Sequence, residues 1–330
     1  MNDIPLPKAF NAYIDNNRVF ISSPATLCIY DRNHSYLTYQ FVSLIQDYII
    51  KYNVALTIDL ISLRSFTAAA SLLLFAKVTK CQMAVKDPSH VEVVFPVDKA
   101  VNKMMVECGL WGGIKQGGIS KIRRLIDSNN QYLSGSENIL ESYGKILPAT
   151  LISLMNQGVQ FSNPNTVLFT KGIQEAILNV KYHAYDFSIP TDFYKETGEG
   201  RWWQCCWLDK PSNQLIFIIY DDGKGITNSL RKYYHLKNTD VGDVYDHQLI
   251  EKAMEAGFTR TEDHERGKGS SDIIKTACVF PNSHLIVMSG KGLYRHDCNG
   301  AKPEELPFKM EGTLIQWVLN YNEETNNDYL

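Results

Sequence analysis

The sequence predicts an α/β protein of two domains, and three observations lead to this fold class. Its 330 residues suit two domains better than one or four. In the first third of the chain, patterns typical of strands alternate with patterns typical of helices, as in a layer of helices packed on a sheet. In the second half, a helical segment precedes a continuous apolar strand, Leu215–Tyr220. Both halves are therefore expected to pack helices against a sheet.

The elements of the first domain follow from hydrophobic periodicity. Residues 54–60 alternate apolar and polar side chains, which is the pattern of a strand, and residues 91–95 form a second β run. Residues 37–50 and 68–80 carry apolar side chains at helical spacing. A further helix is expected from Asp98, a residue suited to cap it, to Cys108.

The stretch from Ile21 to Trp111 resembles a STAS domain, the family that includes bacterial anti-sigma factor antagonists. The resemblance centres on residues 54–74, which read as a strand, a short loop and a helix start. In the family, that helix start carries Asp-Ser-Ser-Gly, whose serine accepts a phosphoryl group. Here Thr67 is followed by Ala68, Ala69 and Ala70, so the acceptor hydroxyl is missing and Thr67 is interpreted as a helix cap. Residues 1–111 are assigned to this STAS-like α/β domain.

A glycine-rich segment follows the first domain. Residues 112–118 contain four glycines in seven positions, and basic and then polar residues follow them. This composition predicts a linker over residues 112–135. The second domain is assigned to residues 136–330, with helices expected over residues 136–155 and 165–185.

The second of these helices carries three polar side chains at a spacing of four residues. Glu175, Asn179 and His183 therefore share one helical face. Because the neighbouring positions are apolar, the helix is expected to be buried, and an asparagine in mid-helix then needs a compensating role. A carboxylate, an amide oxygen and an imidazole in one line could bind a hydrated metal and activate a water. The alternative is a polar stripe that faces solvent.

The buried strand ends abruptly at two carboxylates and two glycines. Asp221 and Asp222 are followed by Gly223 and, one residue later, Gly225. Glycines with this spacing allow the backbone to turn tightly and approach a ligand, and a carboxylate at the strand end can accept a hydrogen bond from an exocyclic amine. The alternative is an ordinary Asp-Gly loop.

Two further signals lie downstream. A turn with Gly267 and Gly269 leads into a helix, whose first N–H groups can face phosphates. This turn is not a Walker A element, because Gly269 stands where a serine or threonine must follow the lysine. Near the end of the chain, Gly312 and Thr313 form a step into a strand.

In this order, the four signals resemble the N, G1, G2 and G3 boxes of the GHKL ATPases, and the local match is nearest to the anti-sigma factor serine kinases. The resemblance spans residues 136–320 and implies a Bergerat fold, with helices on one face of a mixed sheet. It also implies a lid over residues 227–264, in which residues 246–257 are expected to form a helix. ATP and Mg²⁺ are the implied ligands.

The resemblance also implies a role for each residue of the boxes. It implies that Glu175 orients or deprotonates the attacking group and that Asn179 holds Mg²⁺, with His183 near the phosphates. It implies that Asp221 receives the adenine amino group and that Thr313 supports Asp221. The glycines have two implied roles: Gly223 and Gly225 make room for the nucleotide, while Gly267 and Gly269 let the lid close.

The leading interpretation is a Mg²⁺-dependent ATP-binding protein that hydrolyses ATP slowly and acts as a nucleotide-controlled regulatory switch on a partner protein. One alternative is a protein serine/threonine kinase, in which the same site delivers phosphate to the partner's hydroxyl. The other is a non-catalytic module that binds nucleotide and docks a regulatory protein. A homodimer is compatible with each of them.

Composition excludes other classes of function. The formal net charge of −3 argues against a protein that binds nucleic acid through phosphate neutralisation. No apolar stretch approaches the roughly 20 residues that cross a bilayer, so no membrane segment is expected. The seven cysteines are an odd number without a Cys-x-x-Cys pair, which indicates neither a disulfide framework nor a zinc site. A reducing cytoplasm is the expected location.

Overall fold

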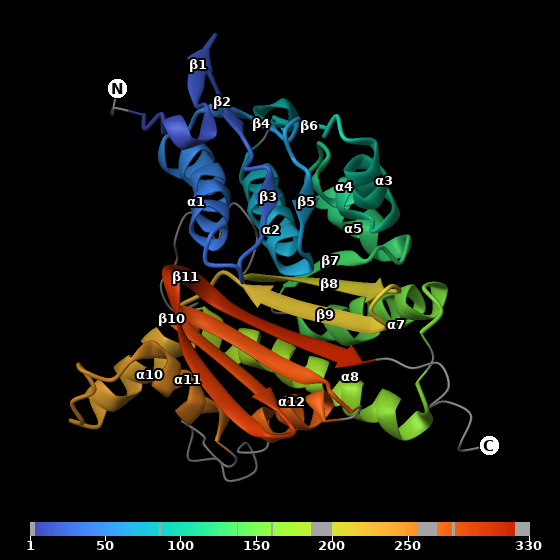
Figure 1. Ribbon diagram of the computed structural model, residues 1–330, viewed down its shortest axis with the longest axis vertical. Coiled ribbons are helices and arrows are strands. Elements are labelled where there is room, and N and C mark those ends of the chain that lie inside the picture. Colours follow the sequence, from blue (N-terminus) through green and yellow to red (C-terminus); the bar gives the residue numbers. More distant parts are fainter. Residues whose placement is uncertain are drawn as a thin grey trace. The chain divides into compact units, whose positions relative to one another are not determined.

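A computed structural model of the chain describes residues 4–85, 87–136, 138–159, 161–185, 200–255, 269–278 and 281–320. It is a mixed α/β structure with helices and several sheets (Figure 1). The described residues form two compact units, the first ending at Ser134 and the second beginning at Gly135. The division therefore falls inside one strand, β7 (Tyr132–Ser136).

The first unit is built around a four-stranded sheet with the order β1-β2-β4-β6. Strand β4 runs parallel to both of its neighbours, and only β1 is antiparallel to the strand beside it. Two short strands, β3 and β5, pair separately and in parallel. The strands are β1 (Tyr13–Asp15), β2 (Arg18–Ser22), β3 (Thr26–Leu27), β4 (Ala55–Asp59), β5 (Ser65–Phe66) and β6 (Val91–Val94).

Two helices of this unit begin at the caps that the sequence predicts. The N–H of Ala70 donates to the Thr67 hydroxyl at 3.4 Å, so Thr67 caps the next helix, α2. The Asp98 carboxylate accepts from the N–H of Ala100 at 2.9 Å and caps α3. The helices are α1 (Ser35–Gln46), α2 (Ala68–Ala84), α3 (Lys99–Glu107), α4 (Leu110–Ile114) and α5 (Ile119–Asp127). The predicted strands and helices of this region are thus present within a few residues of their expected ends.

The predicted linker is different, because residues 112–135 contain the end of α4, all of α5 and most of β7. Gly113 is buried, and a Cβ there would stand 2.7 Å from a ring carbon of Phe75 on α2. Lys121 is also buried, with 2 % of its surface exposed. The glycines therefore permit close packing of α4, and residues 112–134 belong to the first unit up to the point where β7 joins the sheet of the second.

The second unit is built around a five-stranded sheet with the order β10-β11-β9-β8-β7. The pairs β8/β9, β9/β11 and β10/β11 are all antiparallel. The strands that follow β7 are β8 (Arg201–Asp209), β9 (Gln214–Asp221), β10 (His284–Asp297) and β11 (Gly300–Asn320). The helices are α6 (Ile139–Glu141), α7 (Leu147–Asn156), α8 (Asn163–Asn179), α10 (Gly225–Leu236), α11 (Asp246–Met254) and α12 (Gly269–Ala277).

Helices α7, α8 and α12 lie along one face of this sheet (Figure 1). Phe169 of α8 meets Phe217 of β9 edge-on at 5.4 Å between ring centroids. The indole of Trp317 on β11 donates to the backbone carbonyl of Ile273 on α12 at 2.9 Å. Because side chains alternate along a strand, Asp221 points to the same face as Phe217. The end of β9 thus directs a carboxylate toward the helix layer.

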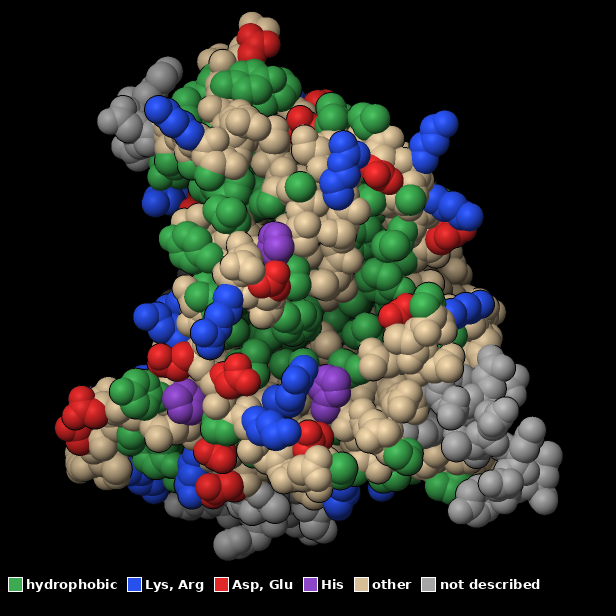
Figure 2. All heavy atoms as spheres, viewed as in Figure 1, with side chains coloured by type: hydrophobic (Ala, Val, Ile, Leu, Met, Phe, Trp, Pro, Cys, Tyr) green, Lys and Arg blue, Asp and Glu red, His purple; other side chains and the backbone are tan. Residues whose placement is uncertain are grey.

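The surface carries no broad field of one charge on the face shown in Figure 2, where acidic and basic described side chains are interspersed. A large basic patch of the kind that nucleic-acid binding needs is not seen on that face. Among the described residues, no helix combines the length and the apolar character needed to cross a membrane.

Candidate functional site

The strand register places the predicted carboxylate in a row of side chains across the sheet. Asp221 on β9 pairs with Trp202 on β8 and with Thr313 on β11, and Thr313 in turn pairs with Ser289 on β10. Only 7 % of Asp221 is exposed. Its carboxylate accepts the N–H of Gly223 at 2.9 Å and hydrogen bonds from the hydroxyl and the N–H of Thr313. The structure thus brings Asp221 and Thr313 together, as the resemblance implies.

The pKa of Asp221 is raised to about 7: burial raises it most and the neighbouring charge of Asp222 also raises it, while the hydrogen bonds from Gly223 and Thr313 lower it. Near neutral pH the group is therefore divided between its acid and carboxylate forms. A ligand that presents an N–H donor favours the carboxylate, because the donor offsets part of the desolvation of the charge.

The two glycines after Asp221 have the close contacts that a glycine requires, but the contacts are with the protein itself. Gly225 has φ +78°, and a Cβ there would stand 2.8 Å from the carbonyl oxygen of Gly312. A Cβ on Gly223 would collide with the carbonyl of Ala184. Glycine is therefore required at these two positions by contacts within the protein, which pack the turn tightly.

Three residues that sequence reasoning missed hold this turn in place. The Ser289 hydroxyl accepts the N–H of Ile226 at 2.9 Å and donates to the carbonyl of Gly312 at 2.8 Å. The Tyr185 hydroxyl accepts the N–H of Asp222 at 3.1 Å. Ala184 accepts the N–H of Lys224 at 2.7 Å. No sequence pattern points to any of the three, because each acts through its backbone or through a contact between segments that are far apart in the chain.

The polar stripe that resembles an N box lies on α8 and its continuation. After Asn179 the helix widens into a π-helical turn, Val180–Ala184, a feature often found at functional sites. Glu175 and His183 are half-buried, and Asn179 is exposed. The helix buries one apolar face, which includes Ile177, and leaves Asn179 on the open side. Its amide is accessible to solvent or to a ligand.

Glu175 lies against the start of α12. A Cβ on Gly269, the first residue of that helix, would stand 2.6 Å from the Glu175 carboxylate. Partial burial raises the pKa of Glu175, and the charge of Asp272 raises it further. Helices α8 and α12 are therefore in direct contact, whereas Gly267 lies outside the described residues.

The predicted site residues form two clusters that α8 connects. One cluster contains Asp221, its glycine turn and Thr313, and it meets the helix at Ala184. The other contains Glu175 and Gly269, earlier on the same helix. Asn179 and His183 lie between these two points of contact in the chain. In the part of the chain that the structure describes, no group of three His, Cys, Asp or Glu side chains could hold a metal ion by itself.

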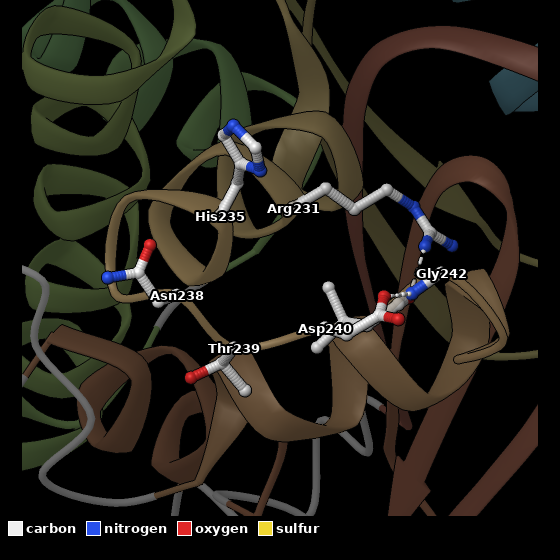
Figure 3. Close-up of a pocket in the computed structure, with 7 residues that line it drawn as sticks. Arg231, His235, Asn238, Thr239, Asp240 and Gly242 are labelled. Atoms are coloured by element: carbon white, nitrogen blue, oxygen red, sulfur yellow. Dashed lines mark hydrogen bonds between the residues drawn. The ribbon is translucent and has the colours of Figure 1, made fainter.

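A separate cavity of about 470 Å³ lies where α10 leads toward α11 (Figure 3). None of the seven residues that line it is a predicted site residue. The guanidinium of Arg231 donates to the carbonyls of Val241 and Val244 at 2.8 and 2.6 Å and to the Asp246 carboxylate at 3.0 Å. Arg231 therefore organises this loop. The segment belongs to the predicted lid, whose expected helix is present as α11 over Asp246–Met254.

No protein-family model matches the chain, and neither does the sequence of any curated protein. The candidate site therefore depends on the geometry of its own residues.

Proposed function

We propose that the second unit binds an adenine nucleotide together with Mg²⁺ and hydrolyses it slowly, so that the protein acts as a nucleotide-controlled regulatory switch. The observation that carries this proposal is the Asp221 carboxylate, which ends a buried strand and points toward the helix layer. A carboxylate offers about four acceptor positions. The N–H of Gly223 and the hydroxyl and N–H of Thr313 occupy three of these positions. One acceptor position is left for the exocyclic amine of adenine.

The N-box residues support the phosphate part of the proposal. Asn179 is exposed, and its amide oxygen is the kind of hard ligand that Mg²⁺ takes. The described residues offer no complete metal site, so Asn179 fits a Mg²⁺ ion that binds together with the phosphates of the nucleotide, as is usual for this ion. Such an ion would neutralise phosphate charge. The first N–H groups of α12, which begins at Gly269, would face the same negative charge.

Glu175 is the proposed base. Its pKa is raised by burial and by Asp272, which makes the carboxylate a better proton acceptor from an attacking water or hydroxyl. The raised pKa of Glu175 favours a catalytic site over a module that only binds nucleotide. The protein kinase alternative uses the same residues and differs only in the acceptor, which is a partner's hydroxyl in place of water.

The test measures Mg-ATP binding and ADP release in the same samples. The Glu175→Ala variant should bind Mg-ATP almost as the wild type does, while turnover falls by about 10²- to 10⁴-fold because the base is lost. Asn179→Ala should weaken binding when magnesium is present. Lys171→Ala, an exposed position on the same helix, serves as the control and should leave both quantities unchanged.

Two outcomes would refute the proposal: no binding of Mg-ATP by the folded wild type, or unchanged turnover in Glu175→Ala. Transfer of phosphate to an added protein, with little release of inorganic phosphate, would favour the kinase alternative.

A further inference from the structure

Two of the seven cysteines are exposed, and both belong to the second unit. Cys278 follows the last residue of α12, and Cys298 lies in the turn that joins β10 to β11. Four of the others are buried and Cys28 is partly buried. Access to a reagent in solution therefore distinguishes Cys278 and Cys298 from the rest.

The bend of the β10–β11 hairpin returns its tip to the start of β10. In a straight strand, His284 and Arg295 would lie about 36 Å apart at roughly 3.3 Å per residue. Instead, the guanidinium of Arg295 lies 3.5 Å from the His284 imidazole. The register shifts on both sides of Gly290, which has φ +60°, mark where the strand folds back. The bent ribbon is visible in Figure 1.

This bend brings the hairpin tip, which carries Cys298, back to the start of β10, which follows Cys278 by six residues. Cys298 directly follows Asp297, whose charge acts on His284, and Cys278 lies just before His284 in the chain. Partial burial raises the pKa of Cys278, and the charge of the Cys298 thiolate raises it further, which agrees with the return of the hairpin tip toward this region.

We propose that Cys278 and Cys298 form a reversible disulfide by exchange with a low-molecular-weight disulfide such as oxidised glutathione. One thiolate attacks a glutathione sulfur, which forms a mixed disulfide and releases one glutathione. The second thiolate then attacks the protein sulfur of that mixed disulfide and releases the other glutathione. Two electrons pass from the protein to the glutathione pair, and the two thiol protons end on the released thiols. The bond would tie the end of α12 to the hairpin tip, and it does not depend on nucleotide binding.

The test incubates the reduced, folded full-length chain with oxidised glutathione, blocks the remaining thiols with N-ethylmaleimide in denaturant, and digests the protein with trypsin without reduction. Cleavage after Lys275, Lys291, Arg295 and Lys309 should yield one linked pair, residues 276–291 joined to residues 296–309. Reduction should separate the pair. Cys278→Ser and Cys298→Ser should each lose the linked pair completely and carry glutathione on the remaining exposed cysteine.

The same incubation in urea is the control, because an unfolded chain with seven thiols should give mixed linkages in place of this one pair. The proposal is overturned if the folded wild type carries separate glutathiones on Cys278 and Cys298, forms linked dimers, or pairs either residue with another cysteine.

Discussion

A single buried carboxylate decides the chemistry of the candidate site. Asp221 would be an unfavourable residue in this position without the donors of Gly223 and Thr313, because a buried charge needs hydrogen bonds to offset its desolvation. These donors do not restore an ordinary pKa, which remains raised to about 7. The residue therefore costs stability when it ionises, as is common for groups kept for function.

The first prediction concerns the pH dependence of folding. The folded-state pKa of about 7 lies above the ordinary value of 3.8, so the folded state binds the Asp221 proton more tightly than the unfolded state does. The resulting stability is fully present below pH 3.8 and is lost as the pH rises through 7. Between these limits, the free energy of unfolding of the wild type should fall by about 1–4 kcal/mol relative to Asp221→Asn. Parallel pH profiles from urea titrations of the two proteins would contradict the shift.

The same ionisation should appear in ligand binding. An adenine amine donates to the carboxylate form, so nucleotide affinity should rise as the pH increases from about 6 to about 8. The comparison with Asp221→Asn removes the contribution of the phosphates' own titration, since both proteins bind the same ligand. Fluorescence titrations with a labelled adenine nucleotide measure the effect. An equal slope in both proteins would mean that Asp221 does not face the base.

A buried lysine explains why the glycine-rich segment is folded. The ammonium of Lys121 donates to Gln82 and to the carbonyls of Gly113 and Lys115. Lys121→Met should lower the free energy of unfolding of the first unit by about 1–3 kcal/mol, because these acceptors lose their donor. Lys115→Met, at an exposed position nearby, is the matched control and should change it little. Equal urea midpoints for the two variants would show that the buried donor is dispensable.

At the scale of elements, close packing joins α8, which carries Glu175, to α12, which begins at Gly269. Gly172 lies directly against Thr276, and a Cβ there would collide with the Thr276 hydroxyl. That hydroxyl donates to the carbonyl of Leu168 at 3.0 Å, which leaves it little freedom to move. Packing against Thr276 therefore requires a glycine at position 172. The sequence alone shows only that a glycine lies inside a helix.

Gly172→Ala should destabilise the second unit by about 1–3 kcal/mol through overpacking. Gly144→Ala is the control, because a Cβ at Gly144 meets nothing within 4 Å and the residue is exposed in a helical turn. Gly144→Ala should leave the free energy of unfolding unchanged or raise it by up to about 1 kcal/mol. Thermal unfolding of both variants tests the contact, and a Gly172→Ala protein as stable as Gly144→Ala would contradict it.

Periodicity and caps made most elements predictable. The strand at residues 214–221 and the helices begun by Thr67 and Asp98 depend on local chemistry, so the sequence alone suffices to place them. The linker was mispredicted because four glycines resemble a flexible segment until Gly113 is seen against Phe75. The exposure of Asn179 could not be decided from the sequence, because helical periodicity gives the faces of a helix but not which face is covered.

At the scale of the whole molecule, each unit has its own sheet, and the candidate nucleotide site belongs to the second unit alone. The hydrogen-bond partners of Asp221 come from the turn after β9 and from β11, and the turn is bonded to Ala184 at the end of the helical segment that continues α8. Segments that are distant in sequence are thus brought together by one sheet. Only Asp221, its glycines and Thr313 could be predicted for this cluster, because Ser289, Tyr185 and Ala184 contribute through tertiary contacts.

The most direct test of this account is the dissociation constant for Mg-ATP, measured by isothermal titration calorimetry on wild type, Asp221→Asn and Asp209→Asn. The control residue, Asp209, ends β8 at the opposite end of the sheet. Loss of a hydrogen bond to a charged group should cost about 1.5–3 kcal/mol, so Asp221→Asn should bind roughly ten- to a hundred-fold more weakly. Asp209→Asn should bind as the wild type does. A folded Asp221→Asn protein with wild-type affinity would contradict the central claim.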